Sequence, residues 1–176
     1  SSDPTSQVSS DMHASRMDKF LIESISLNSP DAVGMDDDKK GFIITALEWD
    51  PTGNFLAAGT SNGSYCVWDK SGSLKFSVAY HSAPIFAFKW NPNGKVILCG
   101  GEDSSVSIVD SDNGALIYSC KSHSGSVMDV DWKSQHVFTS CSQDTTIKLY
   151  FNNTEGTDSL DCYKSFEIAS VNAHDK

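Results

Sequence analysis

Apolar and polar residues alternate with a period of two in three segments of the chain, residues 44–69, 85–110 and 127–150. β-Branched and aromatic residues are frequent at the apolar positions, which is typical of short, half-buried strands. No segment has a helical period. The pattern therefore predicts an all-β chain of short antiparallel strands.

The three segments are copies of one unit. Each carries a tryptophan and, further along, an Asn or Asp within a tight turn, and successive copies of these anchors are 41 or 42 residues apart. A repeat of about 40 residues with strand-like segments is typical of a β-propeller blade. The anchors are Trp49, Trp90 and Trp132, and Asn62, Asp103 and Asp144.

Turn sequences separate the strands within each unit. DPTGN (residues 50–54) and NPNGK (residues 91–95) combine a proline, which fixes φ, with a glycine, which accepts positive φ. In the third unit this turn shrinks to residues 133–136, which predicts a tighter hairpin. A fourth strand is expected after each unit, at about residues 73–79, 115–121 and 161–167.

The units resemble the WD repeat. Trp68 and Asp69 close the first unit as the eponymous pair of that family does, and His81 and His123 stand where the family has its histidine. The chain departs from the family pattern at Asn62, which replaces the usual turn aspartate. The resemblance implies a buried hydrogen-bond chain that ties the inter-blade loop to the tight turn. Its members here would be His81, Asp103, His123, Asp144 and Trp68.

A closer resemblance, over about residues 19–176, is to the transducin β-like corepressor-complex subunit family. It rests on WDKSGSL (residues 68–74), HSAPIFAFKWN (residues 81–91) and DVDWKSQHVFTSCSQD (residues 129–144). It implies a nuclear, non-catalytic scaffold whose partners are corepressors, a class I histone deacetylase and histone tails. The alternative left open is a substrate-recognition or adaptor WD-repeat subunit of another complex, such as a ubiquitin ligase.

The expected organisation is a WD-repeat propeller fragment, because propellers typically need four to eight blades. Residues 17–176 are expected to form about three four-stranded antiparallel blades plus flanking outer strands, with residues 20–27 (FLIESISL) as the outer strand of a preceding blade. Residues 1–16 are rich in serine and lack periodicity, so they are expected to be a disordered tail. The three blades are placed at about residues 41–79, 83–121 and 125–167.

Charge and composition narrow the class of partner. The formal net charge of −10 opposes binding to nucleic-acid phosphate and favours a basic protein partner. No apolar run approaches the roughly 20 residues of a membrane span, and the first 16 residues lack the apolar centre of a secretory signal. These features leave a cytosolic or nuclear location, and the family resemblance implies the nucleus, with the cytoplasm as a second location. The five cysteines lack C-x-x-C spacing and are expected to be reduced, buried thiols.

The histidines also allow a catalytic interpretation. His123 with Asp144 and Ser140 or Ser142 supplies the residue types of a base, an orienting group and a nucleophile. The same arrangement recurs in the preceding unit, however, and an active site does not repeat once per blade. The sequence has no glycine-rich phosphate loop and no metal-ligand spacing of histidines. We expect no enzymatic activity, no cofactor and no metal site.

Six positions define a candidate partner-binding face. The residue before each tight-turn Asp or Asn should project on the same ring face as a residue near the start of the inner strand. Phe86 and Met128 are of the type that anchors interfaces, although both could instead belong to the inter-blade core. Glu102 favours a cationic ligand. The six residues are Ser61, Glu102, Gln143, Thr45, Phe86 and Met128.

Overall fold

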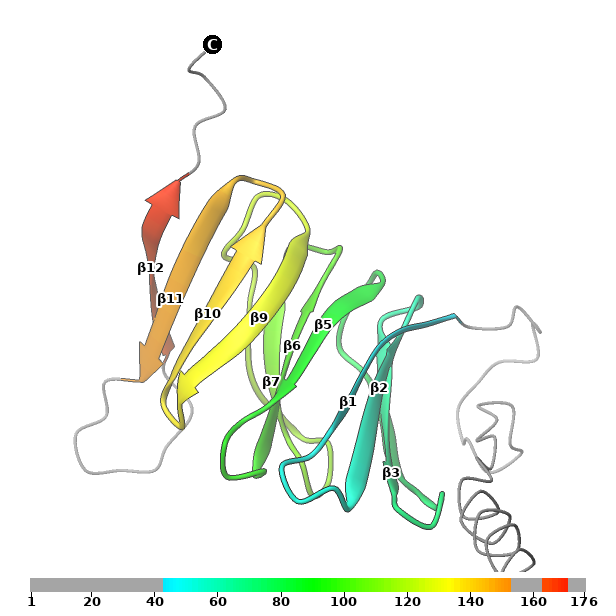
Figure 1. Cartoon of the computed structure of the whole chain (residues 1–176). Helices are drawn as coiled ribbons and strands as arrows, with labels where there is room; N and C mark the ends of the chain where they lie inside the picture. The colour runs from blue at the N-terminus through cyan, green and yellow to red at the C-terminus, as the bar shows by residue number, and fades with distance from the viewer. Residues whose placement is uncertain (1–42, 153–162, 171–176) are drawn as a thin grey trace, which may run out of the picture.

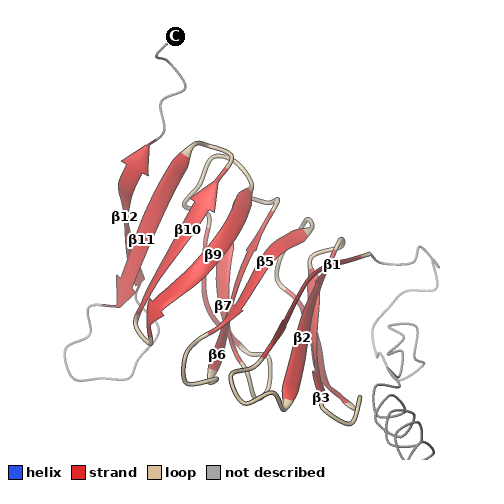
Figure 2. Cartoon of the chain, in the orientation of Figure 1, coloured by secondary structure: helices blue, strands red, loops and turns tan. Residues whose placement is uncertain are grey.

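The computed structural model describes residues 43–152 and 163–170, and every regular element in this part of the chain is a β-strand (Figures 1 and 2). The strands form three four-stranded antiparallel sheets, so the expected fold class is confirmed. Blade 1 contains β1 (Ile44–Trp49), β2 (Phe55–Thr60), β3 (Ser64–Asp69) and β4 (Leu74–Ala79). Blade 2 contains β5 (Ile85–Trp90), β6 (Val96–Gly101), β7 (Val106–Asp110) and β8 (Leu116–Cys120). Blade 3 contains β9 (Val127–Ser134), β10 (Val137–Ser142), β11 (Thr146–Asn152) and β12 (Tyr163–Ser170).

Within each blade the strands pair in chain order, so the first strand forms one edge of the sheet and the fourth strand forms the other. The sheets stack face to face, and the first strands β1, β5 and β9 lie side by side in the stack (Figure 1). We call these the inner strands, and we call the end at which they begin the rim. The expected tail at residues 1–16 and the expected outer strand at residues 20–27 lie outside the described residues.

Side-chain caps form the turns between the first and second strands. Asp50 Oδ1 accepts a hydrogen bond of 2.7 Å from the backbone N–H of Phe55, and Asn91 accepts equivalent bonds in blade 2. Gly53 and Gly94 adopt φ angles of 69° and 71°, which an L side chain rarely adopts. In blade 3, by contrast, β9 and β10 are joined by two residues, as the shortened turn predicts.

The core lies between the blades. Neighbouring residues of β6 face opposite ways, since Ile97 packs toward blade 1 and Leu98 packs toward blade 3. Blade 2 is therefore buried on both faces, which favours a nearly continuous apolar strand. At the blade 2–blade 3 interface the rings of Phe138 and Tyr150 stack with centroids 4.3 Å apart. No helix in the described part of the chain is long and apolar enough to cross a membrane.

Glycines let the blades approach closely. A Cβ atom at Gly59 would lie 2.7 Å from the side chain of Ile85, and one at Gly100 would lie 2.6 Å from the side chain of Val127. Both glycines lie on the second strand of one blade, and both aliphatic residues begin the inner strand of the next blade. The same contact is thus repeated at both inter-blade interfaces.

Candidate functional site

A β-bulge near the start of each inner strand positions three of the six candidate face residues. The register between β1 and β2 shifts between Ile44 and Ala46, which leaves Thr45 as the extra residue. The shift recurs around Phe86 in β5 and around Met128 in β9. A bulge leaves one residue unpaired and redirects its side chain, so these residues are presented differently from their strand neighbours.

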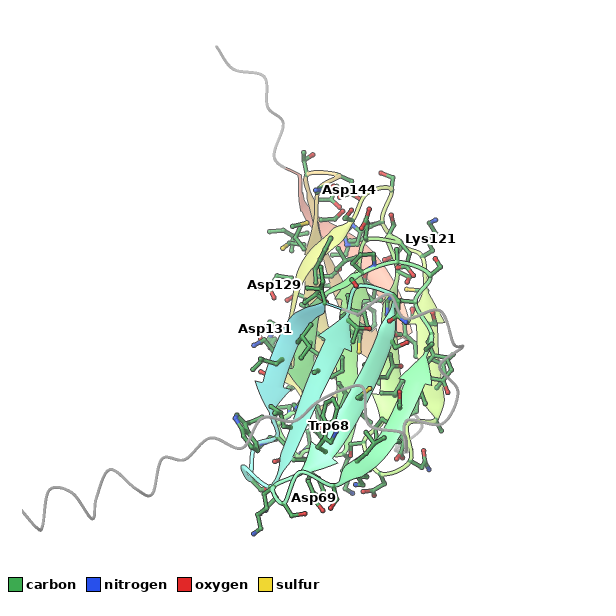
Figure 3. All side chains as sticks on the ribbon, turned by 90° about the vertical axis from the view of Figure 1, so that its right-hand side faces the viewer. Trp68, Asp69, Lys121, Asp129, Asp131 and Asp144 are labelled. Carbon is green, nitrogen blue, oxygen red and sulfur yellow. The ribbon has the colours of Figure 1, made fainter. Side chains whose placement is uncertain are left out.

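Backbone hydrogen bonds place the other three residues beside the bulges. The N–H of Ser61 donates to Ile43, that of Glu102 donates to Pro84, and that of Gln143 donates to Ser126, at 2.9, 2.8 and 2.9 Å. Each acceptor carbonyl belongs to the residue directly before its inner strand. The turn between the second and third strands is therefore tied to the inner strand at the rim, and the six residues share this end of the blades. In Figure 3, Asp144 of the blade 3 tight turn lies at one end of the molecule and Asp69 of blade 1 lies at the other.

The six rim residues differ in exposure. Glu102, Gln143 and Met128 are exposed, whereas Ser61, Thr45 and Phe86 are half-buried. Met128 is thus an exposed thioether at the rim. The Thr45 Oγ1 atom is buried and has no hydrogen-bond partner within the described residues.

In blade 2 a histidine connects the inter-blade loop to the tight turn. His81 Nδ1 lies 3.0 Å from Asp103 Oδ1, and His81 Nε2 lies 2.8 Å from Ser107 Oγ. Asp103 also accepts hydrogen bonds from the Ser82 backbone and from the Ser105 hydroxyl. Partial burial raises the pKa of the Asp103 carboxyl, but hydrogen bonds from Ser105 and His81 outweigh that effect and lower the pKa to about 2.

Blade 3 has an equivalent network with a different hydroxyl. His123 Nδ1 lies 2.9 Å from Asp144 Oδ2, and His123 Nε2 lies 2.7 Å from Ser140 Oγ, which is 3.0 Å from the Tyr150 hydroxyl. Desolvation raises the pKa of Asp144, but hydrogen bonds from Thr146, the Ser124 backbone and His123 lower it well below its usual range. Both histidine side chains are fully buried.

The structure separates Trp68 from these two networks. Trp68 packs in its own buried cluster with Ala58 and Cys66 in blade 1. Ala58 occupies the position of Ser140, so blade 1 has no hydroxyl at the place where the blade 3 network has one. The turn of blade 1 is held instead by the Asn62 side chain, which accepts hydrogen bonds from the Thr60 hydroxyl and the Ser64 backbone.

The networks also contain Ser107 and Tyr150, which the repeat pattern does not predict. Cys99 stands in blade 2 where Ser140 stands in blade 3, and the histidine of blade 2 contacts Ser107 on the third strand instead. Because Cys99 has no hydroxyl, the sequence could have indicated that His81 must bind a hydroxyl on another strand. Chemically, each imidazole has both nitrogens engaged and no access to solvent, so the networks hold turns in place. The described residues contain no group of three or more side chains suited to binding a metal ion.

The comparisons with protein families identify WD40 repeats. The family "WD domain, G-beta repeat" matches residues 36–69, and the family "Anaphase-promoting complex subunit 4 WD40 domain" matches residues 67–135. The two matches together span all of blades 1 and 2 and the first strand of blade 3.

Curated relatives come from several complexes. The human "F-box-like/WD repeat-containing protein TBL1X" is 38% identical over 60% of this chain and 18% of its own length. The "SIR4-interacting protein SIF2" of Saccharomyces cerevisiae is 35% identical over 41% of this chain and 14% of its own length. The "COMPASS component SWD3" of the same yeast is 27% identical over 61% of this chain and 35% of its own length. The chain spans about a fifth of the length of the TBL1X relatives.

A solved structure shows the same fold. The β-propeller domain of Myceliophteria thermophila Cps50 (Swd1) superposes with a TM-score of 0.62 at 20% identity, covering 74% of this chain and 42% of that chain. The repeat spacing, the three antiparallel blades and these matches agree with one another. The chain is therefore built of WD repeats and forms part of a WD-repeat β-propeller.

Proposed function

We propose that this protein is a non-catalytic scaffold that binds other proteins through the rim. The observation that supports the proposal is the repeated rim geometry, in which each of three blades contributes one bulge residue and one turn residue at the same end. Exposed Met128 and half-buried Phe86 supply apolar contact, and exposed Glu102 supplies charge. This combination of an apolar centre with a polar surround is typical of protein interfaces.

The buried histidines support a non-catalytic function. A general base must reach the proton that it removes, but His81 and His123 are fully buried and each is hydrogen-bonded through both ring nitrogens. The histidine–aspartate pair also recurs in successive blades, although the hydroxyl partner differs. Such repetition fits a structural role in each blade and does not provide a single asymmetric set of reacting groups.

More specifically, we propose a nuclear subunit of a transcriptional corepressor and histone deacetylase complex, which contacts histone tails. Two observations support this assignment. The net charge of −10 and exposed Glu102 suit a cationic peptide. Relatives of this chain include a component of the COMPASS complex and a protein named for its interaction with SIR4.

The test is the binding of a fluorescent, lysine-rich histone-tail peptide, measured by anisotropy. Met128→Ala and Glu102→Gln should each weaken binding by about threefold to tenfold at an unchanged melting temperature. Asp112→Asn removes one negative charge at the end opposite the rim and should leave affinity unchanged. Equal losses in Glu102→Gln and Asp112→Asn, with no loss in Met128→Ala, would indicate charge attraction without a rim site and would contradict the proposal. Tighter binding of an acetylated tail than of the unmodified tail would contradict the proposal that the ligand is cationic.

A further inference from the structure

The two inter-blade interfaces share a hydrogen bond between inner strands. The indole N–H of Trp90 donates to the backbone carbonyl of Glu48 at 3.3 Å, and the indole N–H of Trp132 donates to the backbone carbonyl of Lys89 at 3.2 Å. In both cases a tryptophan near the end of one inner strand reaches the residue before the equivalent tryptophan of the preceding inner strand. Trp49 is the third copy of this tryptophan.

The interfaces also share a notch made by two small residues. Ala46 is paired across the sheet with Gly59, and Ala87 is paired with Gly100. The next inner strand places its first residue against each glycine, as described above for Ile85 and Val127.

Charges of opposite sign meet on the inner strands. Lys89 Nζ lies 3.0 Å from Glu48 Oε1, and the Trp90 backbone N–H donates to the other oxygen of the same carboxylate at 2.9 Å. Hydrogen bonding to Glu48 raises the pKa of Lys89 against partial desolvation, and the charges of Asp129 and Asp131 in blade 3 raise it further. Carboxylates on both neighbouring blades therefore stabilise the positive charge of Lys89.

Blade 1 exposes the residues that are buried at the same positions of blade 2. Ile44, Leu47 and Trp49 are 47%, 64% and 52% exposed. Their counterparts in blade 2, which are Ile85, Phe88 and Trp90, are 0%, 4% and 7% exposed. The outer face of blade 1 is thus one half of a third interface of the same kind, and the outer face of blade 3 is the other half of such an interface.

The outer face of blade 3 departs from this pattern. Its notch positions are the cross-strand pair Asp129 and Cys141, in place of alanine and glycine. Asp131 occupies the place of Lys89, and both aspartates are exposed. Figure 3 labels Asp129 and Asp131 along the inner strand of blade 3. This face therefore lacks the small-residue notch of the other two interfaces and carries two negative charges that the blade 2 surface lacks.

We infer that the outer face of blade 3 binds a further blade whose inner strand carries a lysine or arginine at the position equivalent to Lys89. By the internal geometry, that cation would meet Asp131 as Lys89 meets Glu48. A second copy of this chain does not fit, because it would place Glu48 opposite Asp131 and the apolar Leu47 beside Asp129. Like charges at an interface are strongly unfavourable, so the face selects against self-association.

The test is the oligomeric state of the full chain, measured by sedimentation equilibrium. The unchanged chain should be monomeric, whereas Asp131→Lys should self-associate head to tail at least about tenfold more tightly, because the introduced lysine then meets Glu48 of another copy. Asp112→Lys makes the same charge change at the opposite end and should stay monomeric. Adding Trp49→Ala to Asp131→Lys should weaken this self-association, since it removes the indole donor and its apolar contact.

A second variant preserves the internal charge pattern. Glu48→Lys, Lys89→Glu and Asp131→Lys together reverse all three signs, so this variant should be monomeric alone and should associate with the unchanged chain when the two are mixed. Circular dichroism confirms that each variant is folded. Self-association of the unchanged chain that matches the mixture would overturn the inference, as would the absence of any gain in both Asp131→Lys and the mixture. Neither outcome bears on the rim, so failure here is distinguishable from failure of the proposed function.

Discussion

At the scale of single residues, His123 has no spare hydrogen-bonding capacity. Its two ring nitrogens connect Asp144 at the tight turn to Ser140 on β10, and the serine continues to Tyr150 on β11. A buried polar group without a partner costs more free energy than the hydrogen bond itself provides. Each member of this chain of bonds therefore depends on the others.

His123→Ala is expected to lower the free energy of unfolding by about 1–3 kcal/mol, because Ser140 and Asp144 lose their shared partner. Urea denaturation measures the change. His136→Ala, at an exposed position, is the control and should be close to neutral. An unchanged midpoint for His123→Ala together with lost peptide binding would show that the histidine acts in recognition.

The depressed pKa of Asp103 predicts the direction of acid destabilisation. Its pKa is about 2 in the folded chain and about 3.9 in an unfolded chain, so the ionised form stabilises the fold at and above about pH 4. This contribution is lost as the pH falls through that range toward 2. Asp103→Asn should therefore be less stable near pH 5 and should lose less stability than the parent between pH 5 and pH 2. Parallel profiles of unfolding free energy against pH would contradict this expectation.

At the scale of elements, the glycine notch fixes the spacing between sheets. Gly100→Ala would place a Cβ atom 2.6 Å from the Val127 side chain and should destabilise the chain by about 1–3 kcal/mol. Adding Val127→Ala makes room for the new methyl group, so the double variant should be more stable than the sum of the two single changes indicates. A double-mutant cycle by urea denaturation measures the coupling, and strict additivity would argue against the contact.

The strands and their order could be predicted from the sequence because period-two alternation and turn chemistry are local properties. The shortened turn likewise predicted the tight hairpin after β9. The bulges at Thr45, Phe86 and Met128 could not be predicted, since an extra residue in one strand is defined only by its pairing with another. The choice of Ser107 over a hydroxyl on the second strand also depends on contacts between strands.

At the scale of the whole molecule, the described blades bury their apolar surface against one another and leave two unlike faces. Blade 1 presents aliphatic and indole side chains, and blade 3 presents two aspartates beside a cysteine. Because these two faces differ in charge and shape, each face favours a different neighbouring blade. The rim, by contrast, repeats the same backbone geometry in every described blade and varies only in its side chains.

The sequence Glu48, Lys89, Asp131 is negative, positive, negative along neighbouring inner strands. Strict alternation of sign can close on itself only when the number of members is even. In a closed ring with an even number of blades, opposite charges could meet at every contact between neighbouring blades. In a ring with an odd number of blades, at least one contact must join like charges or include a neutral residue. Whether the number of blades is even or odd would then decide whether one contact between neighbouring blades is weaker than the rest. The ring would open at that weaker contact.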